Sequence, residues 1–266
     1  MKTVTSEDGT SIAFDQSGEG PPVILVNGAL GDRSHQMQME LAALLAEYFT
    51  VFNYDRRGRG DSGDTTPYAV EREIEDIDAL IDEAGGSAFV YGVSSGAILA
   101  LEAANALSTK VEKLALYEPP FILDDSRPPL PKDYVEQLDE AIATDDRSAA
   151  VEIFMTQAML VPDEHLEPMR NDPMWAEMET LAHTIAYDGA IVRDVMAGEP
   201  WPTDKWDSVT SPTLVVSGEM SEAFFHDAAN TLVNDLADAQ HHSLEEQSHE
   251  VAPEALVPVL ENFYSA

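Results

Sequence analysis

Apolar and polar positions alternate along the chain in a regular order of short runs and helical spacings. Alternating stretches at 2–6 and 10–16 flank Glu7-Asp8-Gly9, a pattern typical of a hairpin. Continuous apolar runs predict buried strands at 22–26 and 88–91, and further strands are predicted at 50–54, 111–117, 212–216 and 239–244. Amphipathic spacings predict helices between them, at about 35–48, 69–84, 95–107, 222–237 and 253–263. This order predicts an α/β fold with a mostly parallel sheet and helices on both faces.

The alternation is interrupted between residues 119 and 208. No convincing strand pattern occurs there, and proline-punctuated amphipathic spacings predict helices around 131–143, 146–159 and 164–188. A helical insert within a parallel sheet is expected to form a cap or lid. We therefore expect a core made of residues 1–118 and 209–266, and a helical cap made of 119–208.

Composition narrows the possible partners. The chain has 50 Asp and Glu but only 14 Lys and Arg, for a formal net charge of −36. Nucleic acid and anionic membrane would be repelled, so neither is expected as a partner.

No run approaches the eighteen or so apolar residues of a membrane span. Because the first residues lack the apolar centre of a secretory signal, we expect a cytoplasmic protein. The absence of cysteine excludes disulfides, thiolate zinc sites and a cysteine nucleophile.

The acidic residues are spread between apolar stretches, which argues against a disordered acidic chain. An acidic surface that stays hydrated while concentrated salt screens its self-repulsion is the expectation for a halophile's cytoplasmic protein. We therefore expect the melting temperature to rise steeply as KCl reaches molar concentrations. Thermal unfolding followed by circular dichroism over a KCl series measures this, and a melting temperature indifferent to salt would contradict it.

One short motif carries the candidate chemistry. Gly92-Val93-Ser94-Ser95-Gly96 matches G-x-S-x-G between a predicted strand and a predicted helix. Glycines allow the backbone to turn sharply there, so that the serine side chain projects alone above the sheet. By composition the bare motif is weak, and its strand–turn–helix context is what favours Ser94 as a nucleophile over a structural turn. The backbone N–H of Ser95 is then a candidate oxyanion donor.

A second oxyanion donor is expected from the loop after an earlier strand. Asn27-Gly28-Ala29-Leu30 follows the apolar run at 22–26, so the N–H of Ala29 is the candidate, against an ordinary strand exit. Among seven histidines, His249 lies in the loop between the last strand and the last helix. From there it can reach the carboxyl ends of the strands, where such sites lie. The other six are expected at the surface or in packing, with His35 also a candidate for lining the pocket: His35, His165, His183, His226, His241 and His242.

Over nearly its whole length the chain resembles the α/β-hydrolase superfamily. The resemblance rests on the NGAL loop, the YDRRGRGDS loop, the GVSSG elbow, the SPTLVVSG strand and the QSHEV loop, in the superfamily's order. Relatives usually carry His-Gly where this chain has Asn27-Gly28, a change that keeps the backbone donor. The arginines of Asp55–Ser62 are expected to be structural, holding neighbouring loops by ion pairs, more than to bind a substrate anion.

The resemblance also implies a third catalytic residue, an acid. Relatives usually place an Asp about three residues after the Gly that ends the next-to-last strand, but counting from Gly218 gives Ser221. Some members, such as certain haloalkane dehalogenases, take the acid from the end of the strand after the nucleophile helix, and Glu118 occupies that position here. We favour Glu118, which would orient His249. The alternatives are Glu219, Glu222 and Asp227, and Glu118 could instead be a residue that caps the first turn of the insert.

These features predict a serine hydrolase that cleaves a carboxylic ester or lactone through an acyl-enzyme, without metal or organic cofactor. A small, fairly apolar substrate is expected because methionines and a tryptophan of the insert could form a soft pocket wall; they are Met155, Met159, Met169, Met174, Met178 and Trp175. Two alternatives stay open at this point. One is a cofactor-free perhydrolase or haloperoxidase with the same triad, and the other is a non-catalytic ligand-binding member of the fold.

Overall fold

The computed structural model describes residues 1–266 and contains one eight-stranded sheet in the order β1-β2-β4-β3-β5-β6-β7-β8. Pairing is antiparallel between β1 and β2 and between β2 and β4, and parallel elsewhere. The strands are β1 (Lys2–Thr5), β2 (Ser11–Ser17), β3 (Pro22–Val26), β4 (Thr50–Tyr54), β5 (Ala88–Val93), β6 (Val111–Tyr117), β7 (Thr213–Gly218) and β8 (Ala239–Leu244). The predicted α/β class and the predicted strands are confirmed.

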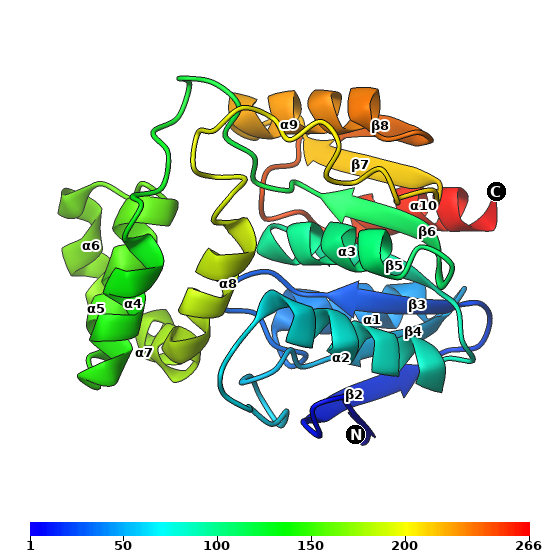
Figure 1. Cartoon of the computed structure of the whole chain (residues 1–266), viewed down its shortest axis with the longest axis horizontal. Helices are drawn as coiled ribbons and strands as arrows, with labels where there is room; N and C mark the ends of the chain where they lie inside the picture. The colour runs from blue at the N-terminus through cyan, green and yellow to red at the C-terminus, as the bar shows by residue number, and fades with distance from the viewer.

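Helices cover both faces of the sheet (Figure 1). They are α1 (Gln36–Leu45), α2 (Val70–Glu83), α3 (Ser95–Ala106), α9 (Ala223–Asp235) and α10 (Pro253–Ser265). Buried residues of α1 and α10 join one apolar cluster, and those of α2, α3 and α9 join the other. Side chains alternate between the two along a strand: Val215 of β7 lies in the second cluster, whereas Leu214 and Val216 lie in the first. The central strands β3 and β5 consist of apolar residues throughout because both of their faces are buried.

The segment between β6 and β7 contains only helical elements and lies beyond the carboxyl ends of the parallel strands (Figure 1). They are α4 (Tyr134–Ala143), α5 (Arg147–Ile153), a π-helix (Phe154–Ala158), α6 (Asp163–Arg170), α7 (Pro173–Leu181), a 3₁₀ turn (Ala182–Thr184) and α8 (Ile185–Val192). The single helix predicted at 164–188 is wrong. Asp172 accepts the N–H of Met174 and Pro173 starts α7, a combination that begins a new helix instead of continuing the old one.

A helix that crosses a membrane must be both long and apolar. None of the helices combines the length and the apolar composition needed to cross a bilayer.

Candidate active site

Ser94 lies at a sharp turn between β5 and α3. Its φ is 56° and its ψ is −127°, a left-handed conformation that a non-glycine residue seldom adopts and that raises its energy by about 1–3 kcal/mol. The turn closes tightly because a Cβ on Gly92 would lie 2.4 Å from Gly96 O, and one on Gly96 would lie 2.4 Å from Asn27 O. The two glycines of the motif are therefore required by close backbone approach, and the strained turn lifts Ser94 to the end of the sheet.

His249 and Glu118 are brought together from distant parts of the chain. The Nδ1 atom of His249 lies 2.6 Å from Glu118 Oε2, and the glutamate side chain is fully buried while the histidine remains 32% exposed. Glu118 follows β6 with a φ of 46°, another left-handed non-glycine residue at this edge. The other carboxylate oxygen, Oε1, accepts the N–H of Gly218 at 2.7 Å. The carboxylate is thus fixed by two contacts and can orient the imidazole ring through one of them.

The last residues of two neighbouring strands, β6 and β7, contact the loop that carries His249. The Tyr117 hydroxyl donates to the carbonyl of Ser248. Gly218 ends β7 directly under the same loop, where a Cβ would lie 2.4 Å from Gln247 O. The ring of Phe225 stacks on the His249 ring at a centroid distance of 4.8 Å and an interplanar angle of 11°. These contacts limit the positions that the imidazole can take.

None of the residues considered as alternatives for the acid forms a hydrogen bond or an ion pair with His249. Ser221, at the usual acid position, has a buried hydroxyl without a hydrogen-bond partner. Glu219 accepts the N–H of Glu246 at 3.2 Å, Glu222 pairs with Arg127 at 3.0 Å, and Asp227 is exposed. Glu118 is therefore the carboxylate in contact with His249.

Two backbone segments border Ser94 and can supply oxyanion donors. Gly28 lies against the nucleophile turn, since a Cβ there would be 3.1 Å from Ser94 Cβ, and Ala29 follows it in the same loop. Ser95 is the first residue of α3, where backbone N–H groups have no acceptor within the helix. No direct hydrogen bond joins the Ser94 hydroxyl to the His249 ring, although both side chains border the same cavities.

Comparison with known proteins gives the family. A model of the alpha/beta hydrolase family matches residues 23–255. The chain belongs to the alpha/beta hydrolase family. A solved alpha/beta hydrolase from Sphaerobacter thermophilus DSM 20745 is 50% identical, covers 99% of this chain and 100% of its own, and superposes with a TM-score of 0.90. Among curated proteins, the uncharacterized hydrolase YraK of Bacillus subtilis is 32% identical over 115 residues, a match that spans 42% of each chain.

More distant solved structures share the fold alone. A thermophilic esterase from Thermogutta terrifontis is 20% identical with a TM-score of 0.73, and the match covers 99% of this chain and 97% of that one. An enol-lactonase from Burkholderia xenovorans LB400 is 21% identical with a TM-score of 0.70 and full coverage of both chains. The superfamily resemblance and the fold expected from the sequence are thereby confirmed.

In this alpha/beta hydrolase, two cavities meet at the candidate nucleophile. The first, of about 280 Å³, is bordered by the loop after β3 and by His35, as the sequence suggested it could be. The second, of about 110 Å³, lies between the sheet and the helical insert. Both are bordered by Ala29, Ser94, Phe154, Met159 and His249. Phe154 belongs to the π-helix and Met159 follows it, so the insert contributes to both cavities.

The predicted methionine wall is only partly present. Of the methionines and the tryptophan named from the sequence, Met159 alone borders these cavities. Met174 is 53% exposed, and Trp175 is buried within the insert, where its indole N–H donates to Ser148. The reason is that helical spacing shows which side chains are apolar without showing which surface of a multi-helix insert faces the sheet.

Three residues of the second cavity had no signal in the sequence. Arg127, 7% exposed, donates to Glu222 and to the Ala158 carbonyl and stacks on the ring of Phe224. Asp188 is buried on α8, and Phe225 stacks on His249. The cavity wall therefore contains charged groups that are paired within the protein.

No cluster of three or more His, Asp or Glu side chains has an arrangement able to hold a metal ion.

Proposed function

We propose that this alpha/beta hydrolase cleaves a carboxylic ester or a lactone through an acyl-enzyme formed on Ser94. The observation that carries the proposal is the 2.6 Å contact between His249 Nδ1 and Glu118 Oε2, at the edge of the sheet where Ser94 adopts its left-handed turn. A buried carboxylate that fixes the tautomer of a half-exposed imidazole leaves Nε2 free to accept a proton. That arrangement suits a general base that deprotonates a neighbouring hydroxyl group, here that of Ser94.

The proposed reaction has two steps. His249 Nε2 takes the hydroxyl proton of Ser94 as Oγ attacks the carbonyl carbon, and the two groups approach one another when substrate is bound. The N–H groups of Ala29 and Ser95 stabilise the oxyanion, and His249 then protonates the leaving alcohol. In the second step His249 deprotonates water, which attacks the acyl carbon; the bond from that carbon to Ser94 Oγ then breaks, His249 returns the proton to Oγ, and the carboxylic acid leaves. The Glu118 carboxylate stabilises the imidazolium in both steps.

The two cavities support a small substrate with two arms. An ester has an acyl side and an alcohol side, and cavities of about 280 and 110 Å³ both border Ser94, the first lined in part by α1 and the second in part by α8 and α9. Ten of the nineteen residues around the larger cavity are hydrophobic, as are nine of the seventeen around the smaller one. Apolar walls with a few polar groups favour an uncharged substrate of modest size. Two proteins that share the fold are named as an esterase and an enol-lactonase, which agrees with this class.

We further propose that residues 119–208 act as a cap over the site and that 1–118 and 209–266 form the core. Arg127, Phe154 and Met159 of this segment border the cavities, which supports the division. A cap of this kind would exclude water from the oxyanion and select substrates by shape.

The proposal is tested by labelling the protein in high salt with a fluorophosphonate and locating the adduct by mass spectrometry. We expect one adduct, on the peptide that contains Ser94, and turnover of p-nitrophenyl esters or of simple lactones that the same reagent abolishes. An adduct on another residue, or none in a folded sample that turns over no ester or lactone, would overturn the assignment of the nucleophile. Addition of peroxide to the assay shows whether water or peroxide is the preferred acceptor.

A further inference from the structure

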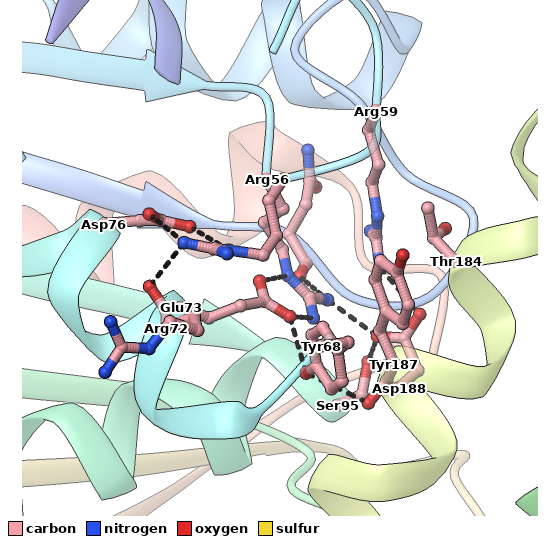
Figure 2. Close-up of polar contacts among 12 residues, drawn as sticks. Arg56, Arg59, Tyr68, Arg72, Glu73, Asp76, Ser95, Thr184, Tyr187 and Asp188 are labelled. Carbon is pink, nitrogen blue, oxygen red and sulfur yellow. Dashed lines mark hydrogen bonds and ion pairs between the residues drawn. The ribbon is translucent and has the colours of Figure 1, made fainter. Parts of the chain in front are cut away.

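A buried network of charges connects the helical insert to the core beside the site (Figure 2). At its centre is Asp188 of α8, which is 3% exposed. Its Oδ1 accepts Arg56 Nη1 at 2.6 Å and the Ser95 hydroxyl at 2.7 Å, and its Oδ2 accepts Arg59 Nη2 at 2.6 Å. One carboxylate of the insert thus contacts both the arginine loop that follows β4 and the first residue of α3.

The same arginines hold the loop that carries the first candidate oxyanion donor. Arg59 Nη1 donates to Gly28 O at 2.5 Å and to Gly31 O at 2.9 Å, and Arg56 Nη1 donates to Asn27 O at 3.2 Å. In a trans peptide the C=O and the following N–H point in opposite directions. Because the Gly28 carbonyl points at Arg59, the N–H of Ala29 points away from Arg59, in a peptide whose Gly28 lies against Ser94.

Asp188 holds the second donor more directly. The N–H of Ser95 opens α3, and the hydroxyl of the same residue is bound to Asp188. A single carboxylate, that of Asp188, therefore holds both candidate donors. It contacts Ser95 directly and reaches the loop of Ala29 through Arg59.

Charge balance makes Arg59 depend on this carboxylate. Arg56 has a second acidic partner, Glu73, at 2.7 Å, whereas Asp188 is the one acidic side chain that Arg59 contacts. Burial by itself would raise the pKa of Asp188, but Arg56 and Arg59 outweigh burial and hold the pKa below its ordinary value. Asp188 is therefore ionised at neutral pH, and its removal would leave Arg59 as an unbalanced buried charge.

We propose that Asp188 is a positioning residue for the oxyanion hole, through which docking of α8 on the core aligns the N–H groups of Ala29 and Ser95. The proposal rests on the proposed hydrolase function, since it names the device that shapes the same site. Asp188 touches no reacting atom; it acts through Arg59 and Ser95. The structure assigns no such part to Arg57, which pairs with Asp76 and Asp8 and makes no contact with the oxyanion loop.

The test compares Asp188→Asn with the wild type in high salt, using a p-nitrophenyl ester and an alkyl trifluoromethyl ketone. The ketone adds Ser94 to give a tetrahedral oxyanion, so its inhibition constant reports how well the hole is formed. We expect the variant to lose about 30- to 100-fold in kcat and an equal factor in ketone affinity, as misplaced donors do, while KM stays within about threefold. The unfluorinated ketone, which stays a ground-state ligand, should bind both proteins equally.

Asp76→Asn is the matched control, because it breaks a buried arginine pair of the same loop. It should lower the melting temperature without changing kcat or the affinity for the ketone. If Asp188→Asn does not fold, Ser95→Ala decides, with an expected loss of about five- to tenfold in both quantities. Folded variants with unchanged kcat and ketone affinity would overturn the positioning role alone. A wild type that the ketone does not inhibit would overturn the proposed hydrolase function and the positioning role with it.

Discussion

Replacing Ser94 by alanine is expected to lower kcat for p-nitrophenyl esters on the order of 10⁶-fold, the loss typical when a serine nucleophile is removed. The reason is that the acyl-enzyme cannot form, while the oxyanion donors and the cavities remain. Fluorophosphonate labelling should be lost together with turnover. The fold should be retained, and relief of strain in the left-handed turn is not expected because alanine has the same Cβ as serine.

The matched control is Ser221→Ala. Ser221 stands where relatives carry their acid, and its buried hydroxyl has no hydrogen-bond partner, so its loss should leave kcat within about twofold. Initial rates at several substrate concentrations, measured on protein with a native circular dichroism spectrum, separate kcat from KM. Substantial residual turnover by Ser94→Ala that is absent from a mock purification would contradict the role of Ser94.

The strands of the sheet could be predicted from the sequence because their physical signal is local. The run Pro22–Val26 is apolar without alternation, and β3 has these bounds. β6 also matches its predicted range, and its last four residues, Leu114–Tyr117, form a buried apolar run. A strand buried on both faces selects apolar side chains at every position, and glycines or polar residues end it.

The insert was less predictable because tertiary packing decides its helix ends. A spacing that could continue from residue 164 to 188 is broken at Pro173, and the helix predicted at 146–159 changes to a π-helix at Phe154. The π-helix shifts the face that Phe154 and Met159 present, and both then border the cavities. Such a change depends on contacts with the core, which the sequence does not record.

The buried charges show a second limit of prediction from the sequence. Helix α2 has a polar face that would normally be exposed to solvent, yet Glu73 and Asp76 are each 1% exposed because they pair with Arg56 and Arg57. The sequence indicated that arginines of this loop would form ion pairs, and these contacts confirm it. It gave no indication of the third partner, Asp188, because that residue is 129 positions from Arg59 and lies on a helix of the insert.

Glu118→Gln should lower kcat by about 10³- to 10⁴-fold with little change in KM. Glutamine keeps the shape of the side chain but carries no charge, so the imidazolium that forms in both steps loses its stabilising partner. An amide NH₂ facing His249 Nδ1 would also favour the tautomer with the proton on Nε2, which cannot accept the proton of Ser94. An amide oxygen can still accept the N–H of Gly218, so the local backbone should be retained.

The control variants are Glu219→Gln and Asp227→Asn, which remove the charge of two alternative acids without a contact to His249. Their kcat should stay within about threefold of the wild type. Steady-state kinetics of the three variants on one ester, with melting temperatures measured in the same salt, decides the assignment. Full turnover by Glu118→Gln, with a large loss in either of the others, would return the acid to the segment after β7. The 2.6 Å contact to His249 would then be a structural tie of the loop, because a carboxylate so close to the imidazole must lower kcat on removal if the imidazole is the base.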